Sequence, residues 1–166
     1  MDNHKMNKHT EIQYNFQIAK IFHHHIPFYK HFKKITLGCL LGSALWSYLI
    51  YHLCNIQNTL ALTIIVIITF YIQFYLIKTF AMNQKASVPY INQTYQLVKY
   101  IPYPKTSNKQ NSISLDLNPF EELRTQIKQN SDFLGKLDRI HNPSYQDIEN
   151  LYLEYKHRHL SSNILR

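Results

Sequence analysis

Between Ile35 and Ile77 the chain contains no Asp, Glu, Lys or Arg. The region divides into two apolar runs, 35–54 and 59–77, which are joined by a short polar turn. A helix that crosses a bilayer needs about 20 mostly apolar residues, since each adds about 1.5 Å across a hydrocarbon core about 30 Å thick. Both runs have that length. The sequence therefore predicts an all-α membrane protein built on a two-helix transmembrane hairpin.

Four segments are expected along the chain, and they differ in charge and in periodicity. They are a basic, aromatic N-terminal arm with an interfacial helix (1–34), the two-helix transmembrane hairpin (35–77), an extended linker (78–118) and a C-terminal helical hairpin (119–166). The linker is expected to be extended because Pro89, Pro102 and Pro104 restrict the residues before them to extended backbone. Within it, residues 86–104 fit a short strand or a short helix equally well.

The N-terminal arm predicts a helix from Thr10 to His25 that lies on the membrane surface. Its apolar residues recur every three or four positions, as on one face of a helix, and Pro27 interrupts the pattern. Aromatic side chains then alternate with bases just before the first apolar run, as expected at a membrane–water boundary. Four lysines are expected to contact anionic lipid head groups: Lys30, Lys33, Lys34 and Lys78.

The first apolar run carries small residues that favour close packing against another helix. Gly38 and Gly42 form a GxxxG pattern, and small side chains let helix backbones approach closely in lipid. Gln73 is the one strongly polar side chain of the second run, and its amide should face protein because a bare amide is costly in lipid. The second run or a partner helix is expected to cover this face. The predicted helix-packing residues are Gly38, Gly42, Ser43, Trp46, Ser47 and Gln73.

The C-terminal segment contains two helix starts. Asn118 would cap a helix whose first position is Pro119, and Ser144 is followed by Asp147 as a capping-box partner. The second helix carries a seam with spacings of three, four and three residues, made of Tyr145, Ile148, Tyr152 and Tyr155. Tyrosine is enriched where interfaces bind tightly, so the seam is a candidate surface for a soluble partner. Alternatively, the same side chains pack the hairpin itself.

The excess positive charge lies beside the predicted spans. Residues 1–34 and 78–118 each carry a net charge of +4, whereas residues 119–166 are balanced. This distribution fits anionic lipid and membrane topology better than nucleic acid, so no nucleic-acid partner is expected. The positive-inside rule places both termini on the cytoplasmic side, or on the matrix side in a mitochondrion.

No motif in the sequence names a reaction. Three consecutive histidines at 23–25 diverge by about 100° each on a helix, so they cannot all face one metal ion. Glu154 and His157 form one copy of a spacing that di-iron bundles need twice, together with further carboxylates. We therefore expect a protein that is not an enzyme and that has no metal site and no cofactor.

Two functions follow from this architecture. The first is a non-catalytic accessory or assembly subunit of a larger membrane protein complex, whose partners are other transmembrane subunits and anionic lipids. A composition rich in Ile, Asn, Lys and Tyr is typical of an AT-rich genome, which suits a respiratory or ATP synthase complex of the mitochondrial inner membrane or an assembly of the bacterial inner membrane. The second is a membrane-tethered interaction module that recruits a soluble partner through its C-terminal helices. The oligomeric state and the identity of the complex stay open.

Overall fold

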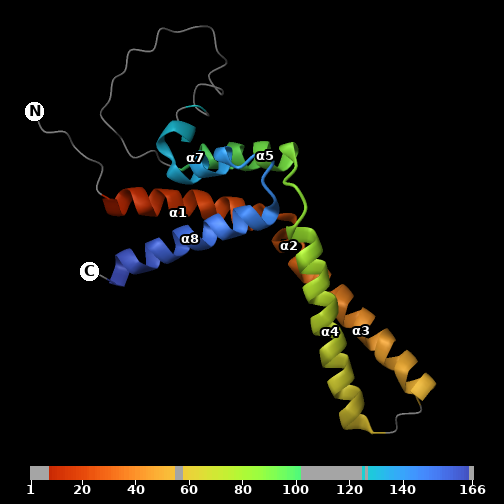
Figure 1. Ribbon diagram of the computed structural model, residues 1–166. Helices are drawn as coiled ribbons and strands as arrows, with labels where there is room; N and C mark the ends of the chain where they lie inside the picture. Colours follow the sequence, from red (N-terminus) through yellow and green to blue (C-terminus); the bar gives the residue numbers. More distant parts are fainter. Residues whose placement is uncertain (1–7, 55–57, 102–124, 126, 165–166) are drawn as a thin grey trace, which may run out of the picture. The chain divides into compact units, whose positions relative to one another are not determined.

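The computed structural model describes residues 8–54, 58–101, 125 and 127–164. Within these residues the chain is helical, with no strand beyond an isolated β-bridge between Lys85 and Ser144. The helices, labelled in Figure 1, are α1 (Lys8–His25), α2 (Pro27–Lys30), α3 (Phe32–Cys54), α4 (Thr59–Met82), α5 (Val88–Val98), α7 (Asp132–Arg139) and α8 (Tyr145–Ile164). The all-α prediction is confirmed for this part of the chain.

The chain divides into two compact units. Unit 1 combines the segments 1–26 and 85–166, and unit 2 is the continuous segment 27–84. Helices α1, α5, α7 and α8 belong to unit 1, whereas α2, α3 and α4 belong to unit 2. Segments from the two ends of the sequence therefore share one core, which the linear order of segments did not suggest.

Unit 1 is organised around the pairing of α1 with α8, which lie side by side (Figure 1). Helices α5 and α7 also pack against α1, and α7 packs against α8. The side chains at the centre are aromatic or aliphatic, and each is almost completely buried: Ile18, Phe22, Val98, Phe133, Leu134 and Ile148. Since they come from four helices, unit 1 folds around contacts between distant parts of the sequence.

The apolar face of α1 is covered by protein. Ile18, Ala19 and Phe22 have no exposed surface, and α8, α5 and α7 pack against this helix. The predicted interfacial helix requires the same apolar stripe to enter the lipid head-group region. In the structure, protein side chains occupy this face of α1, and lipid contact by α1 stays a prediction that this packing does not support.

Residues 88–98, where strand and helix were both open, form helix α5. Ser87 precedes the helix, and Pro89 lies in its first turn, where the missing N–H would have no helical acceptor. The helix is one of the two alternatives left open for residues 86–104, and the proline lies where it begins a helix instead of breaking one. The remainder of the predicted linker, residues 102–118, lies outside the described residues.

Helices α7 and α8 have well-defined starts. The Ser131 side chain caps α7 by accepting a hydrogen bond from the backbone N–H of Leu134 at 3.3 Å. The predicted capping box of α8 is confirmed: Ser144 N donates to Asp147 Oδ2 at 2.9 Å, and Asp147 N donates to Ser144 Oγ at 3.2 Å. The predicted start at Asn118 and Pro119 lies outside the described residues.

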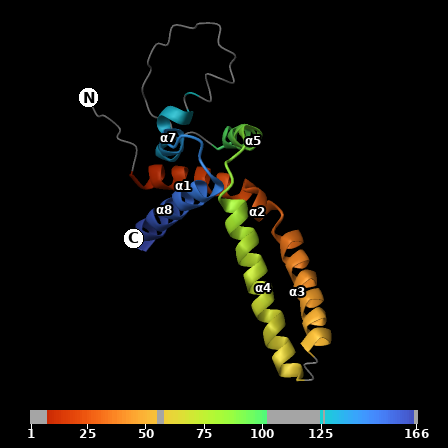
Figure 2. The ribbon, with the colours of Figure 1, turned by 45° about the vertical axis from the view of Figure 1, so that its right-hand side comes forward.

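Unit 2 contains two long apolar helices, α3 and α4, of 23 and 24 residues. They pack side by side (Figure 2). In the most apolar window of each helix, 17% of the α3 residues and 0% of the α4 residues are buried. A core helix of a water-soluble protein would be mostly buried. By length and composition, both helices are able to cross a membrane.

Candidate functional site

The seam between α3 and α4 is lined by small side chains. Cys39, Ser43 and Ser47 lie one turn apart on α3, and each is at most 5% exposed. Ser43 Oγ donates to the Leu40 carbonyl at 2.9 Å, and Ser47 Oγ donates to the Ser43 carbonyl at 2.8 Å. The seam is therefore narrow and its hydroxyls are satisfied within α3.

The two glycines of the GxxxG pattern have different surroundings. A Cβ atom added at Gly42 would lie 2.9 Å from Gln73 Oε1 of α4, whereas one added at Gly38 would meet nothing within 4 Å. Trp46, which was predicted to pack on the same face, is 56% exposed. The structure thus brings Gly42, Ser43, Ser47 and Gln73 together and leaves Gly38 and Trp46 on the outside of the pair.

Further hydroxyl groups of the apolar helices bond to their own backbone. Thr36 Oγ1 donates to the Phe32 carbonyl at 2.9 Å, Thr63 Oγ1 to Thr59 at 2.9 Å, and Thr69 Oγ1 to Ile65 at 2.6 Å. Each acceptor lies four residues earlier in the same helix. These side chains therefore need no water to satisfy their hydrogen-bonding groups, which is what an apolar solvent requires.

One end of the α3–α4 pair carries aromatic rings and the predicted head-group lysines. The Phe74 ring of α4 lies 5.7 Å from that of Phe28 and 5.8 Å from that of Phe32, so the start of α3 lies beside the C-terminal part of α4. The lysines predicted to bind lipid head groups are Lys30, Lys33, Lys34 and Lys78. They fall in the segments that meet at this end; the first three are exposed and Lys78 is half-buried. Lipid contact at these residues stays a prediction.

The tyrosine seam of α8 is used inside unit 1. Tyr145, Ile148 and Tyr155 are at most 6% exposed, and Tyr152 is half-buried. The Tyr152 ring stacks on His23 at 4.1 Å and faces Phe16 at 6.2 Å, both from α1. The seam thus packs inside the protein, as in the second alternative, but its contacts reach α1 as well as the neighbouring C-terminal helix; binding of a soluble partner at these residues stays a prediction.

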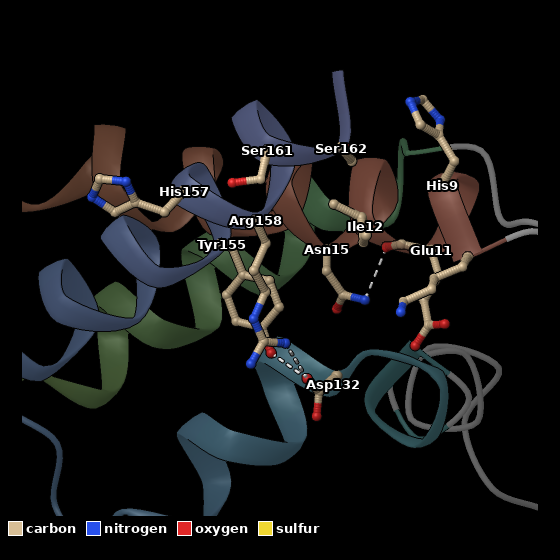
Figure 3. A pocket seen from close by; sticks show the side chains of 11 residues that line it. His9, Glu11, Ile12, Asn15, Asp132, Tyr155, His157, Arg158, Ser161 and Ser162 are labelled. Atoms are coloured by element: carbon tan, nitrogen blue, oxygen red, sulfur yellow. Dashed lines mark hydrogen bonds and ion pairs between the residues drawn. The ribbon is translucent and has the colours of Figure 1, made fainter. Parts of the chain in front are cut away.

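Tyr155 is the centre of a network that links α7 to α8. Its hydroxyl donates to Asp132 Oδ2 at 2.5 Å, and Figure 3 shows Tyr155 and Arg158 pointing toward Asp132. Lys136 bonds to Glu154 at 2.7 Å and Arg158 pairs with both acids, so the four charges balance. Lys136 and Arg158 also lie 5.3 and 5.2 Å from the centre of the Tyr155 ring. We name this network of Asp132, Lys136, Glu154, Tyr155 and Arg158 the clamp, because it holds α7 against α8.

Two buried tyrosines of unit 1 have raised pKa values. Burial raises the pKa of Tyr155 well above its ordinary value, and the hydrogen bond to Asp132 raises it further. Burial likewise raises the pKa of Tyr90, whose hydroxyl donates to the Phe22 carbonyl at 2.5 Å. Both phenols are therefore held in the neutral form, which suits structural hydrogen-bond donors.

Asn15 connects α1 to the start of α7, and sequence reasoning missed it. Its Oδ1 accepts hydrogen bonds from Ser131 Oγ at 2.8 Å and from Phe133 N at 3.1 Å, while its Nδ2 donates to the Glu11 carbonyl at 3.0 Å. Asn15 is 2% exposed. A polar residue within the apolar stripe of α1 was the available signal, but its partners lie more than a hundred residues away.

An open hollow of about 840 Å³ lies between α1 and α8, beside the clamp (Figure 3). Its lining combines charged and polar side chains with apolar surface contributed by their carbon atoms, and it comes from Lys8, His9, Glu11, Ile12, Asn15, Asp132, Tyr155, His157, Arg158, Ser161 and Ser162. Asp132 and Arg158 are already paired with each other. In the part of the chain that the structure describes, no three His, Cys, Asp or Glu side chains are placed to hold a metal ion.

The chain matches no protein-family model, no curated protein and no solved structure. The functional proposal is accordingly based on the exposed apolar surface of unit 2 and on the packing of unit 1.

Proposed function

We propose that the protein is a non-catalytic accessory or assembly subunit of a larger membrane protein complex, anchored by α3 and α4 as a transmembrane hairpin. The observation that carries this proposal is the exposure of large apolar side chains on both helices. Leu45 and Leu60 are each 67% exposed, and Phe80 is 73% exposed. Leaving this surface in water would cost about 25 cal/mol of free energy for each Å² of exposed apolar area. Lipid or other transmembrane helices should therefore cover it.

Two features of unit 2 support a spanning orientation. The hydroxyls of Thr36, Thr63 and Thr69 are satisfied by their own helices, as a hydrocarbon solvent demands. The lysines lie toward one end of the α3–α4 pair. By the positive-inside rule, that end and both chain termini would be on the cytoplasmic or matrix side.

Other transmembrane subunits are the proposed partners, together with anionic lipids. Support comes from Gly38, where the helix backbone is open to a close neighbour, and from the Gln73 amide, which lies at the edge of the seam over Gly42. Close backbone approach and amide hydrogen bonds are the interactions that hold helices together in lipid. The mitochondrial inner membrane, with a bacterial inner membrane as the alternative, remains a prediction from composition.

Membrane extraction followed by mild-detergent separation tests the proposal. The chain should stay in the membrane pellet through high salt and alkaline carbonate, because burial of apolar surface and not charge retains it. In mild detergent it should then migrate with a fixed large assembly. Release by carbonate would disprove the membrane anchor, and recovery of the chain free of other membrane subunits would disprove the subunit role.

A membrane-tethered interaction module is the second candidate function. The open hollow between α1 and α8 favours it, because a hollow on unit 1 that carries both charged groups and apolar surface offers a place for a soluble partner. This function predicts recovery in mild detergent of the chain alone or with soluble proteins in varying amounts. The same experiment therefore separates the two candidates.

A further inference from the structure

Helix α8 has a second apolar face, distinct from the one that packs inside unit 1. Its inner face is buried through Tyr145, Ile148 and Tyr155. Leu153, Leu160 and Ile164 are 39%, 49% and 82% exposed, and they follow one another at intervals of seven and four residues. Such intervals place side chains on one face of a helix, over a length of about 16 Å here. We name these three residues the outer stripe.

The outer stripe is concentrated on α8 and is bordered by basic residues. In the described part of unit 1, the other large apolar side chains with comparable exposure are Val88 and Tyr100. Lys156 and His157 lie between Leu153 and Leu160, one on each side of the stripe, and both are exposed. An exposed apolar line flanked by bases is the pattern of a helix that binds an anionic membrane surface.

The acidic residues near the outer stripe are already engaged. Glu149, one turn before Leu153, is 8% exposed and has an interaction of its own. Glu154 is held by Lys136 and Arg158. The charge that the stripe presents to a partner is therefore positive, which complements anionic lipid head groups.

The connections between the units keep unit 1 close to any membrane that α3 and α4 enter. Helix α1 ends at His25 and α2 begins at Pro27; α4 ends at Met82 and α5 begins at Val88. The longer connection spans at most about 17 Å when fully extended. Tethering at this distance replaces a bimolecular encounter by an intramolecular one, so a small apolar stripe suffices for docking.

We propose that the outer stripe docks unit 1 onto the anionic surface of the membrane that anchors the chain. The proposal rests on the membrane anchoring stated above. A soluble protein partner is a poorer fit, because three side chains fall well short of the about 800 Å² per partner that a standard interface buries. Lipid docking of a tethered unit has no such requirement.

Tryptophan quenching by brominated lipids in proteoliposomes tests the docking. Trp46 is the one tryptophan of the chain and lies in α3, so the unaltered protein reports whether α3 is inserted. In a Trp46→Phe background, Leu160→Trp reports on the outer stripe. The matched control is Gln96→Trp, an exposed position on α5, which packs on α1. Vesicles would contain phosphatidylcholine with or without phosphatidylserine.

With phosphatidylserine present, the tryptophan at position 160 should emit at shorter wavelength and be quenched by bromines near the head groups, whereas the one at position 96 should not. Adding Lys156→Glu should reduce the ratio of docked to undocked protein about tenfold, since it removes one positive charge near the surface and adds a negative one. Ile164→Trp provides a second reporter if Leu160→Trp does not fold.

Each result that contradicts the docking is distinguishable from failure of the anchor. If Trp46 is quenched while positions 160 and 164 behave like position 96, the docking proposal is wrong and the membrane anchor stands. If positions 160 and 164 are quenched equally without phosphatidylserine, recognition of anionic lipid is wrong. If Trp46 itself is not quenched, the anchor on which both proposals depend is wrong.

Discussion

Units 1 and 2 are both built of helices, but they place their apolar side chains in opposite ways. In unit 1, Ile18, Phe22 and Phe133 have no exposed surface. In unit 2, Leu45 and Phe80 are 67% and 73% exposed. Water drives apolar side chains inward, whereas lipid is as apolar as the side chains and leaves them outside. The contrast is the one that the proposed membrane anchor requires, with unit 1 in water and unit 2 in lipid.

Polar groups differ between the units in a parallel way. In unit 1, the Asn15 side chain is buried and bonds across helices to Ser131 and Phe133, more than a hundred residues away. In unit 2, Ser47 and Thr69 bond to the backbone of their own helices. Polar groups fix the tertiary contacts of unit 1, whereas in unit 2 they are satisfied locally. The seam of small residues then sets how closely α3 and α4 approach.

The largest difference is expected when equivalent apolar truncations are made in the two units. Phe22→Ala should reduce the free energy of unfolding of unit 1 by about 3–5 kcal/mol, since it leaves a cavity in a packed core. Leu45→Ala should change the stability of unit 2 by no more than about 0.5 kcal/mol, because the side chain already lies outside. Amide hydrogen exchange of α1 and α8, and of α3 and α4, measures the two effects in detergent. Similar losses in both units would remove the contrast.

Removing the buried amide of unit 1 should have the next largest effect. Asn15→Ala leaves the Ser131 hydroxyl and the Phe133 N–H without their acceptor, which should destabilise unit 1 by about 2–3 kcal/mol. Faster exchange should appear first at the start of α7. Gln17→Ala is the matched control, because this residue is exposed on the same helix. Equal effects of the two substitutions would show that the Asn15 bonds contribute nothing.

The seam of unit 2 is tested by a pair of glycine substitutions. Gly42→Leu should displace the Gln73 side chain and destabilise the α3–α4 pair by about 1–2 kcal/mol, because a packed contact is overfilled. Gly38→Leu should leave the pair unchanged, since nothing lies within 4 Å of its added Cβ. Thermal unfolding in detergent, followed by Trp46 fluorescence, measures both. Loss of the large assembly by Gly38→Leu alone would identify a partner helix at that position.

The smallest expected effect is on the pH dependence of stability. Alkaline pH should destabilise unit 1 and leave unit 2 unchanged. Because the folded-state pKa of Tyr90 is raised, its stabilising effect is complete below the ordinary phenol pKa of about 10 and is lost as the pH rises through the folded value. Unit 1 should therefore loosen in strong alkali while the chain stays in the membrane. Tyr90→Phe should cost about 1 kcal/mol at neutral pH and flatten this alkaline loss.

Hydrogen exchange of α1 across an alkaline series measures that loss. Tyr100→Phe is the control, because Tyr100 is 75% exposed. An alkaline profile that is the same in Tyr90→Phe and in the unaltered chain would show that ionisation of Tyr90 does not limit the stability of unit 1.

Local signals predicted individual helices well. The apolar runs predicted two long helices, and Ser144 with Asp147 predicted the start of α8. Signals with two meanings were less informative: Pro89 was taken as a sign of extended backbone and instead lies in the first turn of α5. A proline marks a point where regular structure changes, but whether a helix ends before it or begins at it depends on packing.

The sequence by itself determined that two helices are apolar enough for a membrane and that the segments of α1 and α8 carry an apolar face, because composition and periodicity are properties of each segment. Only the tertiary structure decided what covers each amphipathic face. The stripe of α1, expected to contact lipid, is buried against α8, and α8 exposes the outer stripe instead. A local pattern specifies that a face must be covered but not by what. The choice depends on contacts such as Asn15 with Ser131, which are separated by 116 positions.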